Sequence, residues 1–280
     1  MGFPKGIRPA PRWLIAIDGA ESTQRWPRAA AVIAPAQRAS MSGNSSQPIA
    51  VVAGAGSGIG AACALNLARQ GHHLILVGRT VEKLDATAQS IVEAGGSASV
   101  FPADVRDWDR LAELQVQLDE TGIDLLINSA GGQFFAPTEE ISRNGWKSVV
   151  DLNLSGSFFL CRLLLPSLRK RRGSVVTVVA NLWQKASPGL VHSAAARAGV
   201  VSMTRTLALE WAKDGIRVNA VSPGLTNTPA LQERYLPLLE KVPLGRIGQV
   251  DEVVDAILFM ARSHYITGEV LTIDGGLHLI

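Results

Sequence analysis

A glycine-rich turn holds the residues whose types and spacing most clearly point to chemistry. It follows an apolar run typical of a buried strand at residues 49–52, and apolar residues at helical spacing follow it over residues 61–70. Glycine tolerates positive φ and lets backbone N–H groups approach an anion, while a helix start adds its positive dipole end. The sequence therefore predicts pyrophosphate binding by the following residues of this turn: Gly54, Ser57, Gly58, Ile59 and Gly60. The alternative is a purely structural tight turn.

The residues after the next strand bear on the choice of cofactor. A second apolar strand is expected at residues 73–78, which completes a β-α-β unit of the dinucleotide-binding kind. Where NAD sites carry an acidic residue near the end of this strand, the chain has Gly78, and Arg79 follows it. Arginine there suits a 2′-phosphate, so we expect NADP(H), unless Arg79 is only a solvated surface residue.

Strands and helices alternate along the rest of the chain, which predicts the α/β class. We expect one Rossmann-type, doubly wound, seven-stranded parallel sheet with helices on both faces. Further strands are predicted at residues 98–101, 125–127, 174–180, 217–221 and 269–273. Further helices are predicted at residues 81–94, from about 108, at 141–171 with an interruption near Pro166, at 193–212 and at 250–262. The proline-bounded segment 229–239 is expected to act as a lid over a chain-like substrate.

The first 46 residues are expected to lie outside the folded, NADP-binding domain at residues 47–280. They show no sustained periodicity, and they are rich in arginine and poor in acidic residues. They could be a transit-like leader, but we favour a mis-set start codon, because Met41 precedes the first strand by a few residues. We expect little packed structure before about Gln47.

Charge and composition argue against several function classes. The first 40 residues hold six basic and two acidic residues, so the other 240 carry −1 of the total charge of +3, and no nucleic-acid partner is expected. No apolar run reaches the ~18 residues of a membrane span. Cys63 and Cys161 fall in apolar helical patterns, and they suggest neither a disulfide framework nor a metal site. We expect a soluble, cytoplasmic protein that binds no membrane.

Several later residues stand where ligands bind in open α/β sheets, at the carboxyl ends of strands. Asp104 follows the third strand, where it could accept from an adenine amino group or simply cap the next helix. Small residues after Asn128 would let a cofactor ribose lie close to the backbone. The very apolar segment 158–165 is expected to pack in part on another subunit.

Over residues 48–276 these motifs resemble the short-chain dehydrogenase/reductase family. Besides the glycine turn, the matching residues are Asp104, Val105, Asn128, Ala130, Gly131, Asn153, Pro223, Gly224, Thr228 and the Asp274-Gly275-Gly276 ending. The resemblance implies a role in NADP(H) binding for these positions other than Asn153 and the ending. It also implies a homodimer or homotetramer built through helices near residues 153–168 and 193–212.

Two segments are more similar to one branch, the peroxisomal trans-2-enoyl-CoA reductases and, more distantly, the 2,4-dienoyl-CoA reductases. They are Gly131-Gly132-Gln133-Phe134 with Gly145-Trp146 downstream, and residues 192–200 followed by residues 207–211. This resemblance implies NADPH-dependent reduction of the 2,3 double bond of a trans-2-enoyl-CoA, in fatty-acyl metabolism.

The chain departs from the family at the catalytic Tyr-x-x-x-Lys, where alignment places Ser193 and Arg197. The family serine after the fifth strand is replaced by Ala180 or Asn181. Ketone reduction delivers a proton to the carbonyl oxygen, so loss of the general acid lowers the rate by roughly 10²–10⁴-fold. Enoyl-thioester reduction needs only hydrogen-bond donors at the thioester oxygen, while the proton goes to Cα. Tyrosine loss therefore disfavours carbonyl reduction more.

The resemblance suggests roles for four residues, each with a structural alternative. Ser193 would hold the developing oxyanion, or act only as a helix N-cap. Asn153 would organise a water molecule or a side chain, or it would only hydrogen-bond the main chain at a break in its helix. Arg197 would hydrogen-bond the nicotinamide ribose, or it would only form a salt bridge on the surface. His192 would relay the Cα proton, or only pack.

Two other functions stay open at this point. One is a 3-oxoacyl or other carbonyl reductase of the same family. The other is a non-catalytic NADP(H)-binding protein whose catalytic machinery has decayed.

Overall fold

The computed structural model describes residues 47–231 and 233–280, and the predicted N-terminal extension at residues 1–46 lies outside them. Seven parallel strands form one sheet in the order β3-β2-β1-β4-β5-β6-β7, which confirms the predicted fold class. The strands are β1 Ile49–Ala53, β2 His73–Gly78, β3 Ser97–Pro102, β4 Leu125–Asn128, β5 Ser174–Val178, β6 Arg217–Pro223 and β7 Val270–Ile273.

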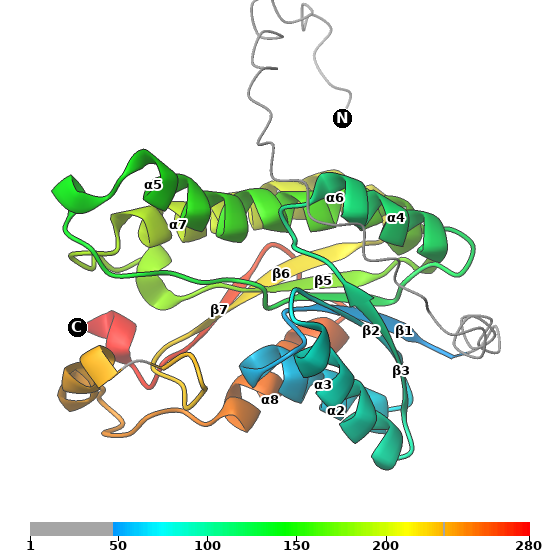
Figure 1. The fold of residues 1–280 in the computed structure, drawn as a ribbon, viewed down its shortest axis with the longest axis horizontal. Helices are drawn as coiled ribbons and strands as arrows, with labels where there is room; N and C mark the ends of the chain where they lie inside the picture. Colours follow the sequence, from blue (N-terminus) through cyan, green and yellow to red (C-terminus); the bar gives the residue numbers. More distant parts are fainter. Residues whose placement is uncertain (1–46, 232) are drawn as a thin grey trace, which may run out of the picture.

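Helices cover both faces of this sheet (Figure 1). Helices α2, α3 and α8 lie on one face, and α4, α5, α6 and α7 lie on the other. Their bounds are α2 Gly58–Arg69, α3 Val81–Glu93, α4 Trp108–Leu118, α5 Arg143–Val150, α6 Gly156–Arg171, α7 Val191–Trp211 and α8 Val250–Arg262. A separate apolar core lies under each helical layer, because the strand side chains alternate between the two faces.

The long helical segment breaks at a different place from the predicted one. Pro166 lies inside α6, whereas the interruption is a π-helical turn at Asp151–Ser155 between α5 and α6. The reason is a tertiary contact: Nδ2 of Asn153 donates to the carbonyl oxygens of Val149 (2.7 Å) and Gly132 (2.8 Å). A side chain inserted into the helical hydrogen-bond ladder is a known cause of such breaks.

The helical stretch Arg143–Arg171 is long and apolar enough, by length and composition alone, to cross a membrane. Half of its most apolar window is buried inside the protein, where α6 packs against the sheet and α4. Core helices of soluble proteins share this property, so the stretch is weak evidence for a membrane span.

The two cysteines are buried and free, in agreement with their predicted place in the core. Burial raises the pKa of both Cys63 and Cys161 to about 12, so neither thiol is a nucleophile at neutral pH.

Candidate active site

A cleft of about 590 Å³ opens at the carboxyl ends of β1, β2 and β4 and contains most of the predicted cofactor residues. Its wall includes Gly54, Ser57, Gly58, Ile59, Arg79, Asp104, Val105, Ala130, Gly131, Arg197 and Thr228. Two other predicted residues, Gly60 and Asn128, contact this wall from behind. Pro223 and Gly224 are not among the lining residues; Pro223 ends β6, and Gly224 packs against Asp274.

The glycine turn is too tightly packed for side chains. A Cβ at Gly60 would lie 2.2 Å from the carbonyl oxygen of Gly54, and Gly54 has a φ of +81°. Ser57 precedes α2 without a side-chain cap, so the first N–H groups of this helix end at the cleft. Thr228 faces Gly58 across the cleft, 3.6 Å from where a Cβ would stand. A bare backbone cradle at a helix start fits the pyrophosphate of a dinucleotide.

Basic and acidic side chains meet at the far end of the cleft, beyond β2 and β3. Arg79 and Lys83 line it, and the charge of Arg79 acts on Asp104. Burial would raise the pKa of Asp104, but hydrogen bonds from the Arg106 side chain and backbone outweigh it, and the pKa is lowered. The predicted capping role of Asp104 is wrong: Asp107 caps α4 by accepting from the N–H of Arg110 at 3.0 Å.

Three side chains form a hydrogen-bonded line beside the cleft. Nη1 of Arg197 donates to Oγ of Ser193 at 2.8 Å, and this hydroxyl donates to Oε1 of Gln133 at 2.6 Å. Ser193 is fully buried, while Gln133 and Arg197 both line the cleft. The line joins α7 to the segment after β4, residues that lie 60 positions apart.

The start of α7 differs from the prediction, and this removes one alternative for Ser193. The helix begins at Val191, and its N-cap position is Leu190, which makes no side-chain capping bond. Ser193 is therefore inside the first turn and is not an N-cap, and His192 is inside the helix rather than before it. The half-buried Arg197 faces the cleft, which disfavours a purely surface role.

Asn153 matches its structural alternative. Its side chain donates to two backbone carbonyls, and its Oδ1 accepts from the N–H of Gly132 at 3.2 Å. Asn153 thus holds both polar backbone groups of Gly132, the residue next to Gln133. Through them it fixes the loop that carries the Gln133 amide.

Gln133 is the site residue to which the sequence assigned no role. It belongs to the quoted Gly131-Gly132-Gln133-Phe134 motif, which is the one signal that could have drawn attention to it. Ala180 and Asn181, at the family serine position, supply no replacement in this line: alanine has no hydroxyl, and Asn181 donates to Asp274 at 3.4 Å.

His192 is buried without exposure, and neither ring nitrogen has a hydrogen-bond partner among the described residues. The ring of Phe134 packs edge-on against it, with 4.5 Å between ring centroids. Burial lowers the pKa of His192 and outweighs the opposing effect of the Leu190 backbone, while the positive charge of Arg197 also lowers it. His192 is therefore neutral at pH 7.

Acidification is expected to destabilise the protein through this histidine. Below about pH 6.5 the His192 imidazole is protonated in the unfolded chain but stays neutral in the folded chain. The free energy of unfolding therefore falls by up to ~1.4 kcal/mol per pH unit as the pH is lowered. His72 and His73 act in the same direction, because burial lowers the pKa of each. The free energy of unfolding is measured with urea at several pH values between 7 and 5. It should depend less steeply on pH in His192→Gln than in the wild type, and an unchanged pH dependence would contradict this assignment.

Comparisons with known proteins agree with the fold and the cleft. Residues 54–278 match the family described as enoyl-(acyl carrier protein) reductase. A probable 2,4-dienoyl-CoA reductase of Bacillus subtilis is 35% identical over 240 residues, which cover 81% of this chain and 94% of that protein. A 3-oxoacyl-[acyl-carrier-protein] reductase of Thermotoga maritima is also 35% identical over 240 residues, or 82% and 97% of the two chains.

Among solved structures, actinorhodin polyketide ketoreductase with NADPH superposes with a TM-score of 0.80 at 29% identity, covering 85% of this chain and 99% of that one. The fold, the cleft and these matches define an oxidoreductase class that binds a nicotinamide cofactor. The chain belongs to the short-chain dehydrogenase/reductase family, close to its dienoyl-CoA reductase branch.

Proposed function

We propose that this protein is an NADPH-dependent reductase of the 2,3 double bond of a trans-2-enoyl-CoA, with a role in fatty-acyl metabolism. The observation that carries the proposal is the hydrogen-bonded line Gln133–Ser193–Arg197. In the sequence alignment Ser193 stands at the family's tyrosine and Arg197 at its lysine. It offers hydrogen-bond donors without an acidic group. Such a site suits a reaction in which the oxygen gains charge but keeps no proton.

The residues around the cleft fit the cofactor. The glycine turn would hold the pyrophosphate, Arg79 the 2′-phosphate and Arg197 the nicotinamide ribose. When bound, NADPH supplies the hydride that reduces the substrate at Cβ.

Ser193 is the proposed donor to the thioester oxygen, which would replace Gln133 Oε1 as the acceptor of its hydroxyl. The N–H that Arg197 donates into the same oxygen polarises this hydroxyl and strengthens its own hydrogen bond. The Gln133 amide reaches the same place from the opposite side. Both groups are preorganised, because Arg197 holds one and Asn153 holds the backbone beside the other.

His192 is the proposed relay for the proton that goes to Cα. A neutral imidazole can donate from one ring nitrogen while it accepts at the other. Among the described residues neither ring nitrogen has a hydrogen-bond partner, so no such bond must be broken first. The Phe134 ring, which now packs against the imidazole, would have to move.

A carbonyl reductase is the second candidate, favoured by the equal identity to a 3-oxoacyl reductase. It lacks support from the site, because no tyrosine lines the cleft within the described residues. Tyr265 is fully exposed on the loop before β7, and the Tyr235 side chain lies outside the described part.

The proposed reaction can be tested by isotope labelling. Purified protein is given trans-2-octenoyl-CoA and NADPH that carries deuterium at the transferable position. We expect octanoyl-CoA with one deuterium, located at Cβ by mass spectrometry. Reduction of 3-oxooctanoyl-CoA alone would support the second candidate, and tight NADPH binding without reduction of either would support a non-catalytic binder.

Arg79→Asp is expected to weaken NADPH binding about 10²-fold, because a charge-assisted bond to the 2′-phosphate is replaced by repulsion. The affinity for NADH should change little. Isothermal titration with both cofactors measures the difference. Arg143→Asp, the same charge change at the exposed start of α5, is the control and should alter neither affinity. Equal losses for NADPH and NADH in Arg79→Asp would discard the 2′-phosphate assignment.

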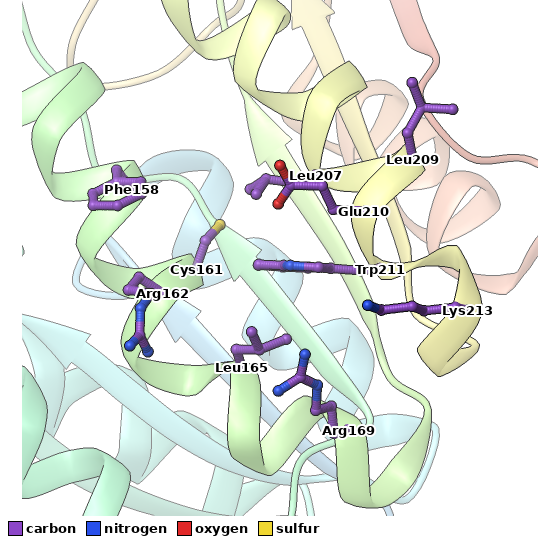
Figure 2. A pocket seen from close by; sticks show the side chains of 10 residues that line it. All are labelled: Phe158, Cys161, Arg162, Leu165, Arg169, Leu207, Leu209, Glu210, Trp211 and Lys213. Atoms are coloured by element: carbon purple, nitrogen blue, oxygen red, sulfur yellow. The ribbon is translucent and has the colours of Figure 1, made fainter. Parts of the chain in front are cut away.

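We further propose that the outer face of α6 and α7 pairs with a second copy of the chain in a homodimer or homotetramer. Figure 2 shows a groove of about 540 Å³ there, in which Phe158 and Leu165 of α6 face Leu207 and Trp211 of α7. The side chain of Leu209 is 83% exposed at its edge, which is unfavourable for a large apolar group in water. The family resemblance implies pairing through the helices near residues 153–168 and 193–212, which include this face.

Leu209→Glu should therefore weaken self-association by roughly tenfold or more, because it places a charge in an apolar contact. Light scattering after gel filtration, over a range of micromolar concentrations, measures the mass. Val116→Glu on α4, at an apolar residue that is 70% exposed, is the matched control and should leave the mass unchanged. A monomeric wild-type protein would contradict the proposal.

A further inference from the structure

An apolar surface lies directly beside the Gln133–Ser193 pair. Phe134 and Phe135 follow Gln133 in sequence and run along the segment that enters α7. The N–H of Ala136 donates to the carbonyl of Gly189 at 3.1 Å, and a Cβ at Gly189 would stand 2.3 Å from the Phe135 ring. Both aromatic rings are thus seated on residues 189–192.

The exposed side of this segment is apolar, and we call it the aromatic rim. Phe134 is 37% exposed, Phe135 45% and Val191 40%. Gly145 of α5 packs on the Phe134 ring, 3.0 Å from where a Cβ would stand, so α5 borders the rim. Single exposed apolar residues need no explanation, but several side by side next to a site mark a binding surface.

The imidazole that packs under the Phe134 ring has unused hydrogen-bonding capacity. His192 is wholly buried there, and within the part of the chain that the structure describes neither ring nitrogen makes a hydrogen bond, an arrangement that costs free energy. A movement of the Phe134 ring would relieve this cost by giving the imidazole access to water or to a polar atom of a ligand. The ring is therefore easier to displace than one packed on an apolar neighbour.

We propose that the aromatic rim binds the acyl chain of the thioester substrate, so that Phe134 and Phe135 determine chain-length preference. The inference rests on the proposed function. A thioester oxygen held by Ser193 and Gln133 places the adjoining chain next to the residue that follows Gln133, which is Phe134. An unbranched apolar chain fits a surface of two phenyl rings and an isopropyl group, and it would cover them from water.

The test measures binding, not turnover. Butanoyl-CoA and dodecanoyl-CoA, saturated thioesters, are titrated calorimetrically into the protein saturated with NADP⁺. The wild-type protein should bind the longer chain at least about tenfold more tightly, since burial of each methylene adds affinity. Phe134→Ala should remove most of this preference by weakening dodecanoyl-CoA about five- to tenfold, with butanoyl-CoA unchanged within about twofold.

Two further variants keep the test decisive. Phe134→Leu should restore the preference, because it restores apolar area, and Phe259→Ala, with an exposure of 51% on α8, should not affect it. If Phe134→Ala fails to fold, Phe135→Ala takes its place, with the same expected loss. Equal weakening of both thioesters, or an unchanged preference in both alanine variants, would overturn the proposal.

These outcomes are separable from those of the proposed function. Chain-dependent binding that depends on Phe134, in a protein that reduces no enoyl thioester, would support the rim and contradict the reductase. Enoyl reduction with no contribution from the rim residues would support the reductase and contradict the rim.

Discussion

Ser193→Ala is expected to lower kcat for trans-2-enoyl-CoA reduction by about 10²–10³, the usual effect of removing one oxyanion donor. The hydroxyl is fully buried and bonded on both sides, so no water can take its place without rearrangement. The affinity for NADPH should stay within about twofold, because the pyrophosphate cradle is far along the chain and untouched. Stopped-flow and steady-state assays of nicotinamide absorbance measure both.

Two controls accompany this variant. Ser202→Ala on the exposed side of α7 changes the same group on the same helix and should leave kcat unchanged. Thermal unfolding separates lost chemistry from lost structure, because removal of the hydroxyl takes one hydrogen bond from Gln133 and one from Arg197, which costs about 1–3 kcal/mol of stability. A kcat that stays within about threefold of the wild type would exclude Ser193 as the donor.

Gly60→Ala is expected to abolish useful NADPH binding, with a loss of more than about 10²-fold, and to destabilise the fold by about 1–3 kcal/mol. The new methyl group would lie 2.2 Å from the Gly54 carbonyl oxygen, a backbone atom that cannot move without opening the turn. Cofactor titration and urea unfolding give the two quantities.

Gly248→Ala is the matched control for this substitution. Its Cβ would meet its nearest neighbour, the Leu225 carbonyl oxygen, at an ordinary 3.4 Å, and its φ is not in the left-handed region. This variant should bind NADPH and unfold like the wild type. Normal cofactor binding by Gly60→Ala would mean that the turn is not the pyrophosphate cradle.

Local patterns were enough to predict the sheet and the cofactor cleft. Strands such as Leu125–Asn128 are short runs of buried apolar residues, which a sequence displays directly. The glycine turn is equally local, because its close contacts lie between Gly54 and Gly60 and against the neighbouring strand end. The 2′-phosphate choice remains a prediction from one residue, Arg79.

Long-range contacts explain where the sequence was insufficient. Pro166 is the obvious local break, yet the interruption is the π-helical turn around Asn153, because that side chain bonds Gly132, 21 residues earlier. The start of α7 was placed two residues late because Leu190 gives no capping signal. Gln133 acquires its role only through Ser193, a partner 60 residues away that no local pattern links to it.

The central claim is that hydrogen-bond donors without an acid favour the enoyl over the carbonyl reaction. The most direct measurement compares kcat/KM for trans-2-octenoyl-CoA and 3-oxooctanoyl-CoA with NADPH under the same conditions. We predict a preference of at least about 10²-fold for the enoyl thioester, since the missing general acid affects only the ketone. Equal rates, or a preference for the 3-oxoacyl thioester, would contradict it.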